Sequence, residues 1–412
     1  MQIAPPLAAP THAPPGVVLP PGEARQAGRW LWGTLAFFLG SFVVGAAWDR
    51  AWHATNPFEG FFSPPHIFVY ATAGVSALLV ARLAWSPRLR VWYGPVVRHR
   101  LLFGTASGAA AIAGIGLMML GFAGLVLDNA WHTRFGLNET LWSAPHAMIG
   151  WSIWVTILGF VAARLGLRAA RPLGPGAAVV LGWLVLGGSV VPFLGPFREN
   201  MTPEQFAARS AWLRQFPALF ATPDFAHTLR IEAAANLTRT HPASVLLGAV
   251  WVGLALALVR GLHRSPWVML AAVALSSALQ LLGDRGDAQR LAAFGLTNWR
   301  DGAQWLPLPV LPAAIALLLL ERTRLYPAAR WAIVGFVYAL CAAFVWGREP
   351  LWIAAVALAP LTCAGGGWLG GRVLRLLEQP TAGGVLRFAP LLCVVGPILS
   401  GAVDLWLRSL IP

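Results

Sequence analysis

Two segments of this chain each carry one carboxylate and two imidazoles at nearly the same spacing. The six residues are Asp49, His53 and His66 in the first segment, and Asp128, His132 and His146 in the second. Two imidazole nitrogens and one carboxylate oxygen suit copper, zinc or iron, and three protein ligands leave positions open for water or a substrate. The pattern therefore predicts two metal sites.

The spacing places each ligand set on a helix hairpin. In both segments the acid and the first histidine are four residues apart, so both side chains project from one face of a helix. The C-terminal end of a helix carries partial negative charge, which favours a cation there. The second histidine follows a short loop and begins the next apolar segment, where in the first set Ser63 can cap a helix and Pro64 or Pro65 suits its first turn.

Other side chains near the two motifs are candidates for an outer layer of each site. Glu59 and Glu139 lie in the loops between the paired histidines, where each is a fourth ligand, a hydrogen-bond partner of a ligand, or a solvated loop residue. Trp52 and Trp131 directly precede the first histidine of each set. Their position is typical of packing or of the aromatic belt of a membrane protein.

A weaker third set combines Asp224, His227 and His241. Its acid and first histidine are three residues apart instead of four, and no tryptophan precedes His227. The alternative is a surface segment with incidental histidines. A structural interpretation also exists for the first two sets, because a histidine near a membrane interface often serves as a hydrogen-bonded anchor.

The composition is that of a helical membrane protein. Of the 412 residues, 57% are hydrophobic and 11% are charged, against roughly 25% charged residues in soluble domains. The apolar residues fall in runs of about 20, which is the length that crosses a bilayer core of roughly 30 Å. We predict an all-α, polytopic transmembrane helical bundle of about eleven spans, built from repeated helix hairpins. The expected spans are 29–50, 64–84, 101–130, 143–166, 175–194, 242–262, 266–283, 305–321, 328–347, 351–371 and 388–408.

Three regions follow along the chain. Residues 1–24 are rich in proline and alanine, and we expect a disordered cytoplasmic tail there. Residues 25–170 are expected to form the metal-binding transmembrane hairpin repeats. Residues 171–412 are expected to form a further transmembrane bundle, in which 195–241 is an outer amphipathic segment.

The arginines predict the orientation. The net charge is +14, but the arginines lie mostly in short loops after even-numbered spans, as the positive-inside rule requires of cytoplasmic loops. We therefore exclude nucleic acid as a partner and expect a lipid bilayer. The sequence predicts an integral protein of a prokaryotic inner (plasma) membrane, with a cytoplasmic N-terminus and both metal motifs on the extracytoplasmic side.

The first motif resembles the metal site of the C subunit of the copper membrane monooxygenases, the family of particulate methane and ammonia monooxygenases. The matching residues are Asp49, Trp52, His53, Glu59, Phe62, Ser63, Pro64 and His66. In that family the aspartate and both histidines bind copper in a transmembrane subunit of a three-subunit complex. The resemblance implies copper at Asp49, His53 and His66, and the second set follows by its internal similarity to the first.

Three functions are compatible with these features. The first is a copper-dependent, monooxygenase-like membrane oxidoreductase that oxidises a small apolar substrate, with partner membrane subunits as the resemblance implies. The second is a non-enzymatic protein that handles metal or assembles a metal site. With only six methionines the chain is poorly suited to conduct Cu(I), which prefers thioethers. The third is a transporter, since internal repeats are common in transporters.

Overall fold

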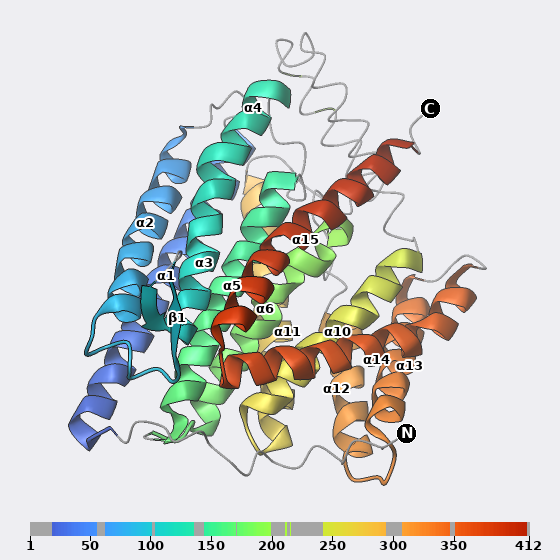
Figure 1. Cartoon of the computed structure of the whole chain (residues 1–412). Helices are drawn as coiled ribbons and strands as arrows, with labels where there is room; N and C mark the ends of the chain where they lie inside the picture. Colours follow the sequence, from blue (N-terminus) through green and yellow to red (C-terminus); the bar gives the residue numbers. More distant parts are fainter. Residues whose placement is uncertain are drawn as a thin grey trace.

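The computed structural model describes residues 19–55, 62–100, 104–135, 144–169, 171–198, 211, 215, 242–293, 307–346 and 351–409. They form a helical bundle with one small two-stranded sheet (Figure 1). The first half contains α1 (Pro21–Thr55), α2 (Pro64–Trp85), α3 (Gly108–Phe122), α4 (Asn129–Phe135), α5 (Ala144–Gly166) and α6 (Pro175–Arg198). The second half contains α10 (Pro242–Leu262), α11 (Pro266–Ala293), α12 (Pro307–Leu320), α13 (Pro327–Trp346), α14 (Leu351–Glu378) and α15 (Ala382–Ser409). The predicted all-α class is confirmed.

Seven helical segments within the described residues are long and apolar enough to cross a membrane. They are Pro21–Asp49, Pro64–Trp85, Gly108–Trp131, Pro145–Gly166, Val245–Leu262, Pro327–Phe344 and Trp352–Glu378. Shorter apolar segments lie in α6, α11, α12 and α15. These helices fit an integral membrane protein in a lipid bilayer. Each of the eleven segments expected from the sequence overlaps a helix, but the number of membrane crossings stays a prediction.

Proline marks the start of most of these helices. Prolines 21, 64, 175, 242, 266, 307 and 327 are each the first residue of a helix. The first turn of a helix does not use its N–H groups for intrahelical bonds, and the fixed φ of proline suits that position. Apolar runs thus become separate helices where a proline follows a polar loop.

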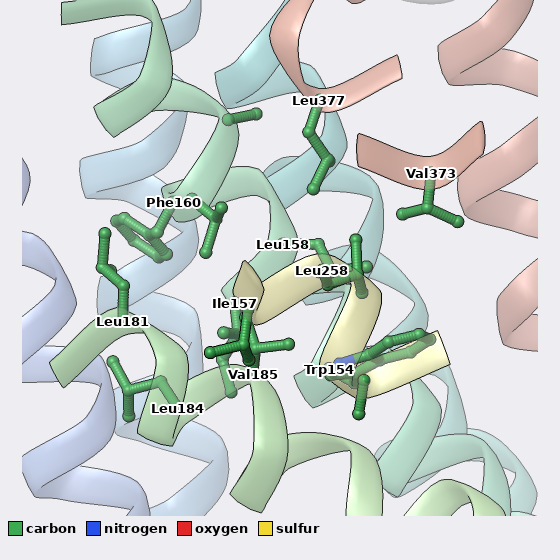
Figure 2. Close-up of a cluster of buried hydrophobic side chains, with 14 of the residues drawn as sticks. Trp154, Ile157, Leu158, Phe160, Leu181, Leu184, Val185, Leu258, Val373 and Leu377 are labelled. Carbon is green, nitrogen blue, oxygen red and sulfur yellow. The ribbon is translucent and has the colours of Figure 1, made fainter. Parts of the chain in front are cut away.

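Helix α5 forms the centre of the bundle. Its apolar window is 94% buried, whereas that of α2 is 22% buried. Figure 2 shows Trp154 and Leu158 of α5 in a cluster with Val185 of α6, Leu258 of α10 and Val373 of α14. The buried core is therefore continuous between the two expected regions, 25–170 and 171–412.

One expected boundary of the N-terminal tail is wrong. Helix α1 begins at Pro21, so residues 21–24 belong to the helix, because the proline starts it well before the apolar run. Leu19 of the expected tail is buried in the core, and residues 1–18 lie outside the described residues. The expected outer segment 195–241 also lies mostly outside them, apart from the end of α6 at Arg198 and two single residues.

The start of the third expected span is also wrong. Strand β1 (Val96–His99) pairs antiparallel with β2 (Gly104–Ser107), so residues 104–107 are extended where we expected helix. The β-branched pair Val96 and Val97 favours a strand, and Gly104 adopts a positive φ of 59° that glycine tolerates best. Helix α3 then begins at Gly108.

The metal motifs and the arginine-rich loops lie at opposite ends of the bundle. The C-terminal end of α1, the start of α2 and helix α4 lie at one end, and strands β1 and β2 lie toward the other (Figure 1). Ion pairs join helix ends and connections at the arginine end, with N···O distances of 3.6 Å, 2.9 Å and 2.6 Å. They are Arg88–Glu23, Arg168–Glu378 and Arg260–Glu321. This separation agrees with the expected polarity, while the side of the membrane that each end faces stays a prediction.

Candidate metal centre

The first motif brings one carboxylate and one imidazole into direct contact. Asp49 lies near the C-terminal end of α1, and His66 is the third residue of α2. Oδ1 of Asp49 is 2.9 Å from Nε2 of His66. The His66 side chain is only 9% exposed and that of Asp49 is 27% exposed, so the pair is largely withdrawn from solvent.

Close packing of α1 on α2 holds this pair together. The rings of Trp48 and Phe68 lie 6.0 Å apart between their centroids. A Cβ atom on Gly45 would overlap the Val69 side chain, so glycine permits the close approach of the two helices. The hairpin therefore returns His66 to the Asp49 face of α1, as the sequence predicted.

Helix α2 begins where the sequence predicted, but the expected capping hydrogen bond at Ser63 is not formed. Ser63 occupies the N-cap and prolines follow it, yet its hydroxyl makes no capping hydrogen bond. Pro64 and Pro65 have no N–H groups, so two of the donors of the first turn are missing. The Ile67 N–H donates to the Ser63 carbonyl at 3.0 Å instead, and the buried Ser63 Oγ has no hydrogen-bond partner among the described residues.

The second motif gives a similar but wider pair. His146 is the third residue of α5, the same position that His66 has in α2. Oδ1 of Asp128 is 3.9 Å from Nδ1 of His146. The Asp128 side chain is only 2% exposed. A carboxylate buried to this extent requires polar or charged partners.

Asp128 ends a π-helical turn that the sequence did not predict. The turn η1 (Ala123–Asp128) connects α3 to α4, where we expected a regular helix. A π turn holds one more residue than an α turn, and such turns are frequent at functional sites. The segment is apolar up to Leu127, so its pattern contains no signal for the turn except the acid at its end.

Tyr70 joins the two motifs, and the sequence analysis missed it. It lies in α2 one turn after His66, with the two ring centroids 6.0 Å apart. Its hydroxyl donates a hydrogen bond to the Asp128 carboxylate and lies close enough to Asp49 for an electrostatic interaction. A Cβ atom on Gly124 in η1 would overlap the Tyr70 ring. The four-residue spacing from His66 was a signal that could have identified this tyrosine.

The first histidine of each set has no described side chain. His53 lies in α1 and His132 in α4, each four residues after its aspartate. Trp52 and Trp131 are half-buried on the same helices. The remaining candidates lie outside the described residues, and these are Glu59, Glu139, Asp224, His227 and His241.

The two described pairs fit pairs of ligands that share a metal ion. Ligand nitrogen and oxygen atoms lie about 2.0–2.2 Å from zinc, so two ligands of one ion are about 3 Å apart at a right angle and at most about 4.3 Å apart. The 2.9 Å pair fits directly, and the 3.9 Å pair fits a wide ligand–metal–ligand angle. No group of three or more histidine, cysteine, aspartate or glutamate side chains gathers among the described residues, so complete sets would need His53 and His132.

The chain matches no protein-family model, no curated protein and no solved structure. The functional conclusion therefore rests on the two Asp–His pairs and on the packing that brings them together.

Proposed function

We propose that this chain is an integral membrane metalloprotein with two His/His/Asp sites at its extracytoplasmic end, and that it oxidises a small apolar substrate with copper. The 2.9 Å contact between Asp49 and His66 carries the proposal. Its arrangement recurs in Asp128 and His146, whose histidine has the same position in its helix.

The proposed ligands come from the same three positions of each hairpin. Asp49 and His66 would hold the first ion with His53, and Asp128 and His146 would hold the second with His132. Copper suits imidazole ligands, and zinc and iron are the alternatives. When bound, copper would supply the electron transfer that activates dioxygen. The aspartates would offset the charge of each ion, and their burial would exclude competing water.

Exposed apolar side chains near the motifs support an apolar substrate. Ile67 flanks the first site in the first turn of α2, and its exposed fraction is 54%. Leu125 in η1 is 50% exposed. In an integral membrane protein these side chains would face lipid or a partner membrane subunit. A small apolar substrate dissolved in the bilayer would therefore reach the sites without crossing water.

Metal analysis of the protein purified in detergent tests the proposed sites. We expect two metal ions per chain in the wild type and one in each of His66→Ala and His146→Ala. His263→Ala is the matched control, because His263 lies at the arginine end, where its Nδ1 accepts a hydrogen bond from the Ser265 N–H at 3.0 Å. The control should retain both ions. Wild-type protein without bound metal would refute the proposal.

Turnover then tests the reaction. Copper-loaded protein should consume oxygen and form an alcohol from a short alkane when a reductant is supplied, and His66→Ala should lose this activity while it remains folded. Metal binding without any turnover would instead favour a metal-handling or assembly protein. A folded protein that binds no metal would favour a transporter with structural Asp–His pairs.

A further inference from the structure

We infer that Tyr70 is a positioning residue of the second metal site, supplied by the first hairpin, so that the second ligand set is complete only when α2 packs against η1. This inference rests on the proposed function. It adds a residue outside both motifs and makes the second site depend on the first hairpin.

The Asp128 carboxylate is buried and needs a partner that fixes its orientation. Its side chain is 2% exposed, and a buried carboxylate whose orientation is not fixed cannot serve as a reliable ligand. Nδ1 of His146 lies 3.9 Å from Oδ1 of Asp128, which exceeds the range of a hydrogen bond. The Tyr70 hydroxyl supplies a hydrogen bond that His146 does not, and it donates this bond to the carboxylate.

The Tyr70 ring is held between His66 and the η1 turn. The ring lies beside His66, and Gly124 leaves the space that the ring occupies against η1. Tyr70 belongs to α2 and Asp128 ends η1, so the hydrogen bond connects the two hairpins. Its geometry is therefore fixed by packing on both sides rather than by the loop of either hairpin.

The chemistry of a carboxylate allows both roles at once. One oxygen of Asp128 can bind a metal ion while the other accepts the hydrogen bond from Tyr70. Hydrogen-bond partners of metal ligands fix ligand orientation, and their removal typically costs about 10- to 100-fold in metal affinity. Tyr70→Phe keeps the ring and removes only the hydroxyl, so it isolates this contribution.

The test measures each site separately. His53→Ala removes one ligand of the first set and leaves the contact between His66 and Tyr70 intact, so the ion that remains reports on the second set. In this background we expect Tyr70→Phe to weaken Cu(II) affinity about 10- to 100-fold in a chelator competition. The Cu(II) electron paramagnetic resonance spectrum of that site should also change, which a purely structural role would not require.

Two controls distinguish positioning from general destabilisation. In the His132→Ala background, which leaves the first set, Tyr70→Phe should change Cu(II) affinity by less than about threefold, well below the loss expected at the second set. Tyr93→Phe removes another buried tyrosine hydroxyl, which donates to the Ala27 carbonyl at 3.0 Å at the arginine end. This variant should leave both sites unchanged.

The possible failures are distinguishable. Wild-type protein that binds two copper ions, together with unchanged affinity and an unchanged spectrum in Tyr70→Phe, would overturn this inference alone. Equal losses at both sites would also overturn it, because they would show general destabilisation. Wild-type protein that binds no metal would overturn the proposed function, and this inference with it.

Discussion

The Nε2 atom of His66 and the Oδ1 atom of Asp49 lie 2.9 Å apart across the ends of two helices. This separation is that of a close polar contact, and it also suits two ligands of one metal ion. The two groups therefore already have the distance that metal binding needs. A bound ion would bridge the two atoms without a large movement of either helix.

Asp49→Asn separates the structural contact with His66 from metal binding. The asparagine amide keeps the size and polarity of the carboxylate and removes its charge, so we expect the metal-free protein to lose only about 1 kcal/mol of unfolding free energy. The neutral amide is a poor metal ligand, so the first site should lose its ion. Thermal unfolding of metal-free protein and metal analysis of the same preparation check both expectations. A large loss of stability without any change in metal content would identify the pair as purely structural.

Gly124→Ala tests the packing of Tyr70 on η1. The added methyl group would overlap the Tyr70 ring, and overpacking of this kind costs about 1–3 kcal/mol. We expect a lower unfolding temperature and a weaker second metal site, since Tyr70 must move away from Asp128.

Gly121→Ala is the matched control for this substitution. A Cβ atom there meets nothing within 4 Å, and alanine favours a helix over glycine by up to about 1 kcal/mol. This variant should therefore be as stable as the wild type or slightly more stable. Equal effects of the two substitutions would contradict the packing that we describe for Tyr70.

The sequence predicted the features that depend on short-range pattern. Asp49 and His66 were expected to meet because a helix end, a short loop and a proline-initiated helix determine a hairpin almost by themselves. The helices themselves follow from apolar runs interrupted by proline. These signals lie within about 20 neighbouring residues, so one sequence is sufficient to detect them.

Features that depend on contacts between distant segments were not predicted. The spacing of Tyr70 from His66 places both on one face of α2, but no local pattern predicts that η1 packs against that face. Gly124 likewise looks like any glycine of an apolar helix. The π turn before Asp128 depends on packing that no local preference specifies. The complete ligand sets were predicted but not tested, because the side chains of His53 and His132 lie outside the described residues.

The contact between α10 and α14 offers a stability test far from the metal motifs. A Cβ atom on Gly366 would overlap the backbone carbonyl of Val250, whereas one on the adjacent Gly365 would meet nothing within 4 Å. Because backbone cannot move aside as a side chain can, we expect Gly366→Ala to cost at least about 2 kcal/mol. Gly365→Ala should be neutral. Thermal unfolding in detergent compares the two, and metal content should be unchanged in Gly365→Ala.

Cysteine labelling tests the predicted orientation in the membrane. Thr323 lies exposed in the connection between α12 and α13 at the arginine end, and Phe62 lies exposed at the motif end. A membrane-impermeant maleimide should label Phe62→Cys in cells whose outer membrane is permeable and whose inner membrane is intact. It should label Thr323→Cys only after the inner membrane is permeabilised, because arginine-rich loops remain in the cytoplasm.

The three native cysteines determine how much maleimide labels the unsubstituted chain. Cys363 and Cys393 are buried and Cys341 is half-buried, so the unsubstituted chain should react weakly before and after permeabilisation. Labelling of Thr323→Cys in intact cells, with Phe62→Cys protected, would reverse the orientation. The two Asp–His pairs would then face the cytoplasm, where glutathione and copper chaperones compete for the metal. A membrane oxidoreductase that receives its metal from the extracytoplasmic side would not be consistent with that orientation.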